Sequence, residues 1–97
     1  MIQHVVLFQW KKGVPAEETD GILKAVADLG RKLPGTRGYA GGSDLSNRNL
    51  NQGFTHGFVL GFEDGASLKF YLEHPDHLRV VERIKKCAER ILVFDAE

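Results

Sequence analysis

Two segments of this chain, residues 2–10 (IQHVVLFQW) and 54–62 (FTHGFVLGF), carry hydrophobic side chains at both odd and even positions. Branched and aromatic residues in short runs predict β-strands, and successive side chains of a strand point to opposite faces of its sheet. The bulkier face comprises His4, Val6, Phe8, Trp10, Phe54, His56, Phe58, Leu60 and Phe62. On the smaller face, Val5, Leu7 and Val59 leave too much apolar surface for contact with water. This sheet therefore needs a cover on each side.

Helical patterns supply the cover for the bulkier face. A helix is predicted between Pro15 and Leu33, where apolar residues recur at intervals of three and four. Asp64 is expected to cap a short helix that ends near His74, and Pro75 to start a further helix at an angle. The predicted inner stripe of that last helix consists of Leu78, Val81, Ile84 and Ala88.

The remaining segments complete one α+β domain over residues 1–97. A weaker strand is expected over 38–45, a polar hairpin loop over 46–53 and a closing strand over 91–95. The order β-α-β-β-α-α-β matches a ferredoxin-like plan, with a four-stranded antiparallel sheet and helices on one face. The smaller sheet face would then stay open, which predicts a homodimer in which two sheets face each other.

Composition argues against several classes of partner. The chain has 13 basic and 13 acidic residues and no net charge, so neither nucleic acid nor an anionic membrane surface is favoured. The single Cys87 excludes an internal disulfide and a cysteine-based metal cluster. The N-terminus lacks a leader pattern, and no apolar run approaches the roughly 20 residues of a membrane span. We expect a soluble, cytoplasmic protein.

Four polar side chains are predicted to converge between the sheet and the helices. His4 and His56 share the bulkier face, His77 is in helical register with the inner stripe, and Tyr71 lies on the apolar stripe of the preceding helix. Imidazoles transfer protons near neutral pH, and a phenol can donate to a developing enolate oxygen. Because no flavin, nicotinamide or phosphate motif is present, we expect cofactor-free enolisation, aldol closure, isomerisation or oxygenation.

Simpler explanations compete with this one. An inward histidine is often a hydrogen-bonded core residue, and His74, beside Pro75, is expected to have a structural or solvent-facing role. A three-histidine zinc site is disfavoured because the spacing of His4, His56 and His77 matches no compact ligand motif. We also expect no acidic side chain in register with them. No metal site is therefore predicted.

The segments HVVLFQWK, GFTHGFVLGFED, YLEHPDH and LVFD, in this order and spacing, resemble the stress-responsive A/B barrel domain (Dabb) family. The resemblance covers nearly the whole chain and implies a ferredoxin-like fold that pairs into a dimeric α+β barrel. Most bacterial members have no assigned activity, and plant members are described as stress-responsive. A plant branch contains cofactor-free polyketide cyclases of the olivetolic-acid type.

Resemblance to that branch implies roles for particular residues. His77 and Tyr71 match the acid–base pair of the cyclases, and His4 and His56 match histidines that line their pocket. The remaining expected pocket residues are Val6, Phe8, Val26 and Phe58. Val26 stands where a cyclase would have a tyrosine, and the stretch GILKAVADL is aliphatic. Some plant members hold magnesium through main-chain carbonyls near the matching segment LGRKLPGT, which offers no carboxylate here.

Three functions remain open from the sequence. The first is a homodimer whose internal pocket binds a small apolar keto or phenolic molecule and transforms it as a cofactor-independent cyclase or isomerase-type lyase. The second is a non-catalytic stress-related or partner-binding module. The third is a cofactor-free monooxygenase.

Overall fold

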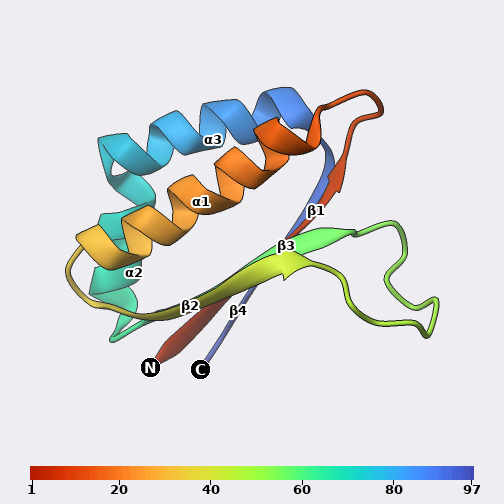
Figure 1. Ribbon diagram of the computed structural model, residues 1–97. Helices are drawn as coiled ribbons and strands as arrows, with labels where there is room; N and C mark the ends of the chain where they lie inside the picture. Colours follow the sequence, from red (N-terminus) through yellow and green to blue (C-terminus); the bar gives the residue numbers. More distant parts are fainter.

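A four-stranded antiparallel sheet forms one layer of the molecule (Figure 1). In the computed structural model, which describes residues 1–97, its order is β2-β3-β1-β4. The strands are β1 (Ile2–Trp10), β2 (Thr36–Ser43), β3 (His56–Phe62) and β4 (Ala88–Ala96). The central pair is β1 and β3, as the ferredoxin-like plan predicts. The two termini lie side by side at one end of the sheet.

Three helices form the second layer, all on one face of the sheet (Figure 1). They are α1 (Ala16–Lys32), α2 (Gly65–Glu73) and α3 (Pro75–Cys87). The predicted cap of α2 is confirmed, because the Asp64 side chain accepts a 2.8 Å hydrogen bond from the Ser67 amide. The predicted order β-α-β-β-α-α-β is therefore confirmed.

The core lies between the two layers, on the bulkier face identified from the strand alternation. Phe8, Leu60 and Phe62 of the sheet and Ile22 of α1 have no accessible surface. Trp10 at the end of β1 is only half-buried and packs on Phe8, with ring centroids 4.7 Å apart. The helix-facing side of the sheet was thus predicted correctly.

The inner stripe of α3 differs from the prediction. Its buried residues are Val80, Ile84 and Cys87, whereas Leu78 is 51% exposed and Ala88 already belongs to β4. The sequence has apolar side chains on two adjoining stripes that share Ile84, so spacing alone does not choose between them. Packing against α1 decides, since α3 contacts α1 and has few contacts with β4.

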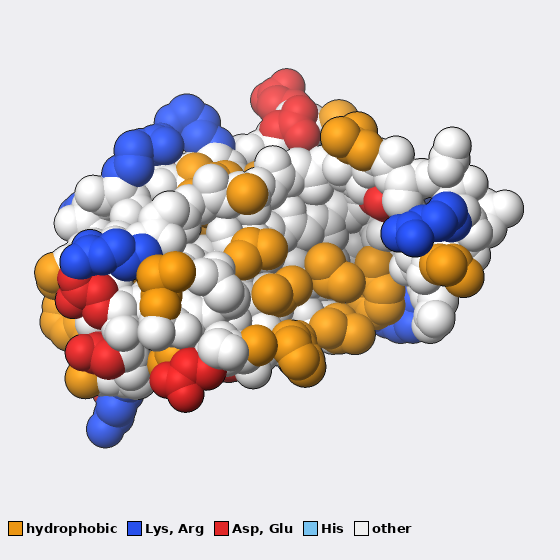
Figure 2. All heavy atoms as spheres, turned by 90° about the horizontal axis from the view of Figure 1, so that it is seen from below, with side chains coloured by type: hydrophobic (Ala, Val, Ile, Leu, Met, Phe, Trp, Pro, Cys, Tyr) orange, Lys and Arg blue, Asp and Glu red, His pale blue; other side chains and the backbone are white.

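The outer face of the sheet has no cover in the single chain. Val5 lies between Val59 and Phe94, and Leu7 lies beside Leu92. Seen from below, hydrophobic side chains gather along this face (Figure 2). None of the three helices combines the length and the hydrophobicity that crossing a membrane would require.

Several strand boundaries also differ from the predictions. β2 spans Thr36–Ser43 rather than 38–45 and β3 begins at His56 rather than residue 54, so the connection between them is longer than the predicted 46–53 loop. β4 spans Ala88–Ala96 rather than 91–95. The helices leave most of the edge strand β4 uncovered, and its helix-side residues Ile91 and Val93 remain exposed.

Candidate functional site

A buried histidine on β1 is paired with a carboxylate on β4. His4 and Asp95 lie directly opposite each other in the register of the two strands, and His4 is only 4% exposed. His4 Nδ1 lies 2.5 Å from Asp95 Oδ1. This contact assigns the imidazole proton to Nδ1 and leaves Nε2 free.

Asp95 was missed by the sequence analysis, and the expectation that no acid lies in register with the histidines was wrong. The available signal was the aspartate at the end of the closing strand, ILVFD. Its partner could not be identified, because the register between β1 and β4 depends on tertiary packing.

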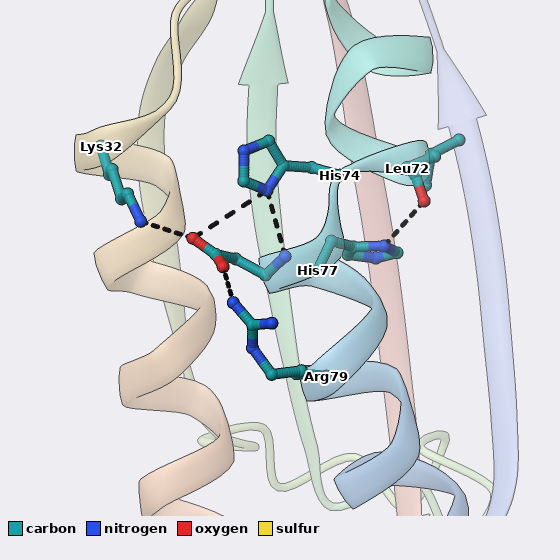
Figure 3. A network of polar contacts seen from close by, with 6 residues as sticks. Lys32, Leu72, His74, His77 and Arg79 are labelled. Atoms are coloured by element: carbon teal, nitrogen blue, oxygen red, sulfur yellow. Dashed lines mark hydrogen bonds and ion pairs between the residues drawn. The ribbon is translucent and has the colours of Figure 1, made fainter.

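The α2–α3 corner brings Tyr71 and His77 together. Their ring centroids are 4.4 Å apart, and the Tyr71 ring lies 6.1 Å from the ring of His4. His77 Nδ1 donates to the Leu72 carbonyl at 3.0 Å, as Figure 3 shows, so Nε2 of this ring is the free basic nitrogen. Tyr71 is 1% exposed. His4, Tyr71 and His77 therefore form one cluster.

The surroundings of this cluster shift the pKa values of His77 and Tyr71. Burial lowers the pKa of His77 below its ordinary value of 6.5; the hydrogen bond to the Leu72 carbonyl acts in the opposite direction, and the proximity of His4 makes a smaller contribution that lowers the pKa. Burial raises the pKa of Tyr71 well above its ordinary value of 10, with a smaller contribution from Tyr39. At neutral pH, His77 is therefore an unprotonated base and Tyr71 a protonated donor.

His56 lies apart from this cluster, although it is on the same face of the sheet. It pairs with Phe8, four residues along β1 from His4, which corresponds to roughly 13 Å of strand. The expectation that all three histidines share one space thus holds for His4 and His77 and not for His56. Alternation identifies the face of a side chain but does not bring together residues at different levels along the strands.

His56 instead neighbours an unpaired indole donor. Its Nδ1 is 2.9 Å from Thr55 Oγ1, and its ring lies 5.9 Å from that of Trp10. Trp10 Nε1 is buried and has no hydrogen-bond acceptor within the chain. A buried N–H without an acceptor is costly, and the Trp10 indole is the buried side-chain donor that the fold leaves unsatisfied.

The predicted pocket lining consists of tightly buried residues. Val6, Phe8, Val26 and Phe58 all belong to the hydrophobic core cluster between sheet and helices. A hollow of about 700 Å³ lies on the outer sheet face beside the β2–β3 connection, and His56 and Phe58 are among the residues that line it. A smaller hollow, about 300 Å³, lies between α1 and α3. Neither contains the His4–Tyr71–His77 cluster, and the internal pocket stays a prediction.

His74 has the structural role expected of it. Its Nδ1 accepts a 3.1 Å hydrogen bond from the Asp76 amide and thereby caps α3. Asp76 in turn binds Lys32 and Arg79 (Figure 3), and the hydrogen bond from Lys32 is the main cause of the lowered pKa of this carboxyl. These contacts hold the connection between α2 and α3 in place, and His77 lies in the first turn after it.

The cluster holds few groups suited to a metal ion. His4 and Asp95 are joined to each other, and no third histidine, cysteine or carboxylate lies close enough to complete a set of ligands with them. The chemistry that these residues support by themselves is proton transfer between His77, Tyr71 and a bound molecule.

Comparison with known proteins identifies the family. The sequence pattern of the stress-responsive A/B barrel domain matches residues 2–97. The Arabidopsis thaliana stress-response A/B barrel domain-containing protein HS1 is 31% identical over 97% of this chain and 86% of its own. Olivetolic acid cyclase from Cannabis sativa is 22% identical over 97% of this chain and 93% of its own.

A solved structure shows the same fold. It is a dimeric ferredoxin-like protein of unknown function from a Jannaschia species, with a TM-score of 0.81 and 27% identity. The similarity covers 99% of this chain and 97% of the other. On the match of nearly its whole length, the chain belongs to the stress-responsive A/B barrel domain family.

Proposed function

We propose that this protein is a homodimer in which each copy binds a small apolar keto or phenolic molecule and transforms it by cofactor-free acid–base chemistry. The observation that carries the proposal is the pairing of His77 with Tyr71 at 4.4 Å between ring centroids. One partner is a neutral base whose Nε2 is free, and the other is a protonated phenol.

The simplest reaction that this pair supports is an intramolecular aldol closure. His77 Nε2 removes a proton from the carbon beside a ketone, and the electron pair moves to the carbonyl oxygen, which Tyr71 stabilises by donating a hydrogen bond. The enolate carbon then forms a bond to a second carbonyl carbon of the same molecule. The resulting alkoxide takes back the proton from His77, so no oxidant or reductant is consumed.

His4 and Asp95 act as a positioning pair in this scheme. The Asp95 carboxylate fixes the His4 ring beside Tyr71 and keeps its Nε2 free to accept a hydrogen bond from a ligand hydroxyl. The cyclase among the relatives, at 22% identity, supports ring closure as the reaction class without identifying the substrate. The lining of aliphatic and aromatic side chains favours an uncharged ligand.

The ligand would enter from the β4 side. The interior beside Phe8 and Phe58 is filled with core side chains, whereas Val93 and Asp95 on β4 are exposed and lead toward His4. This route brings a molecule to the cluster without crossing the packed core.

Self-association is supported by the uncovered face of the sheet. Leu92 and Phe94 are exposed there, and the Jannaschia protein of the same fold is described as dimeric. Two copies that stack these faces would remove the exposed apolar surface from water, which is the main driving force for association.

A non-catalytic binding module is the second candidate, and the filled interior favours it. Phe8, Val26 and Phe58 leave little space near the histidines unless side chains move. In that case His4 and His77 would be hydrogen-bonded core residues, with Asp95 and the Leu72 carbonyl as their partners.

A turnover assay with matched variants separates the two candidates. Linear di- and triketones and phenolic ketones are incubated with the protein, and products are followed by mass spectrometry together with oxygen uptake. We expect His77→Gln and Tyr71→Phe to slow the reaction about 100-fold or more, and the control His74→Asn, which keeps a cap, to leave it unchanged. Equal turnover of every substrate by His77→Gln would sink the catalytic proposal.

Binding without turnover would favour the second candidate. Calorimetry with the same compounds would then show affinity that His77→Gln alters only modestly. Oxygen consumption coupled to product formation would indicate the monooxygenase alternative.

A further inference from the structure

The connection between β2 and β3, residues 44–55, projects from the body of the molecule (Figure 1) but is firmly attached at its base. The Arg90 guanidinium of β4 lies 4.5 Å from the centre of the Phe54 ring and donates to the Gln52 carbonyl. Arg90 Nε also donates to Gln9 Oε1 of β1 at 2.6 Å. One side chain thus joins the loop to two strands.

Hydrogen bonds within the loop give it a defined shape. The Asp44 amide donates to the Thr55 carbonyl at 2.7 Å, and the Phe54 amide donates to the Asn51 carbonyl at 2.9 Å. Asn49 and Gln52 have positive φ angles of 56° and 52°, a conformation that asparagine tolerates well and glutamine adopts rarely. A loop ordered in advance loses little entropy when it binds a partner.

The loop presents apolar side chains that nothing in the single chain covers. Leu45 is 93% exposed and Leu50 is 69% exposed. Both line the 700 Å³ hollow, and its floor includes Val5, Leu7 and Leu92 of the outer sheet face. The hollow therefore connects the apolar residues of the sheet with the two exposed leucines of the loop, and polar residues such as Ser46 and Asn51 lie between them.

We propose that the β2–β3 loop is a docking arm for a second copy of this chain. This inference rests on the proposed homodimer and adds that the interface includes Leu45, Leu50 and the hollow beside them, as well as the stacked sheets. A second copy is the occupant because the hollow is continuous with the face that dimerisation would cover. A twofold dimer uses each arm once, so every substitution in the arm acts at two symmetric positions.

Charge supports the same occupant. The loop carries one acid and one base, Asp44 and Arg48, so it has no net charge. The Asp44 carboxylate is engaged by the amide and hydroxyl of Ser46. An arm without net charge, carrying Leu45 and Leu50 among polar residues, suits an apolar sheet face and offers no excess positive charge to a polyanion.

The test is a dilution series by analytical ultracentrifugation on the full chain. We expect Leu45→Ser/Leu50→Ser to raise the dimer Kd about 10- to 100-fold. The control Phe70→Ser/Leu78→Ser removes two half-exposed hydrophobic side chains from α2 and α3 and should leave the Kd within about twofold of the parent. Circular dichroism melting checks that both variants fold.

A third variant examines the attachment of the arm. Arg90→Gln keeps the apolar side chains but removes the contacts to Gln52 and Phe54, and we expect a several-fold rise in the Kd. If the leucine variant dimerises as tightly as the parent while Phe94→Ser separates the subunits, the arm is refuted and the homodimer stands. A parent protein that stays monomeric at every concentration overturns both.

Discussion

The two faces of the sheet differ in how much of their hydrophobic surface a single chain buries. On the helix-covered face, Phe8, Leu60 and Phe62 are completely buried within a single chain. On the outer face, Leu92 is 41% and Phe94 60% exposed. A single copy of the chain therefore buries only one of the two apolar faces of its sheet. The covered face holds the candidate chemistry, and the open face holds the candidate interface.

Removing a large side chain from the covered face should produce the largest effect on stability. Phe62 is fully buried, and its ring centroid lies 5.0 Å from that of Tyr71. We expect Phe62→Ala to lower the free energy of unfolding by about 3–5 kcal/mol, because it creates a cavity in the core. Urea denaturation measures the loss. A decrease below about 1 kcal/mol would mean that this face is not the core of the monomer.

The matching change on the open face should affect association instead. Phe94→Ser removes an exposed aromatic side chain, so the free energy of unfolding of the monomer should change by at most about 0.5 kcal/mol. The dimer Kd should rise about tenfold or more, as is typical of aromatic interface residues. Sedimentation at several concentrations gives the Kd. A large loss of monomer stability would remove the distinction between the two faces.

A smaller effect on stability is expected from the N-cap of α2, one of the helices that cover the sheet. The Asp64 side chain satisfies the Ser67 amide, so Asp64→Ala should cost about 1 kcal/mol of unfolding free energy. Asp64→Asn, which also caps helices well, is the matched control and should cost less. Thermal melts of the three proteins give the ranking, and equal losses for both variants would point to the charge rather than the cap.

The smallest expected effect is a pH dependence that belongs to the covered face alone. The pKa of His77 is lowered on folding, so the unfolded chain binds more protons as the pH falls below the ordinary value of 6.5. Stability should therefore decrease with falling pH, from about 6.5 down to the pKa of folded His77. Denaturation of parent and His77→Gln across this range measures the difference. Parallel curves would contradict the buried position of His77.

Two carboxyl groups with shifted pKa values titrate outside this window. Asp64 and Asp76 have a lowered pKa, caused chiefly by hydrogen bonds from the Ser67 amide and from Lys32. Their contribution to stability is present above the ordinary value of 3.8 and is lost as the pH falls below it, which is well outside the range in which His77 titrates.

The sequence predicted which side chains share a face of the sheet. It did not predict their positions along neighbouring strands or the residues with which they pair. Alternation in β1 and β3 predicted the buried set around Phe8 and Leu60, because strand geometry alone determines which side chains share a face. It could not show that His56 lies far from His4 along the sheet or that Asp95 pairs with His4. Both facts depend on the register of strands distant in sequence.

The helix α3 shows a second kind of limit. Val80 and Val81 are both apolar, so two stripes fit the helical period, and only contact with α1 selects the one through Val80. The corner at Pro75 was predictable because proline suits the first turn of a helix and cannot continue the preceding one. That corner, in turn, places His77 beside Tyr71.

The most direct test of the covered face as a working site is an NMR titration of the four histidines, alone and with β-keto and phenolic compounds. We predict that His77 titrates below 6.5 and that one class of compound shifts the signals of His77 and His4 together while leaving His74 in place. If every compound leaves all four titrations unchanged, the His4–Tyr71–His77 cluster is a hydrogen-bonded part of the core and not a site.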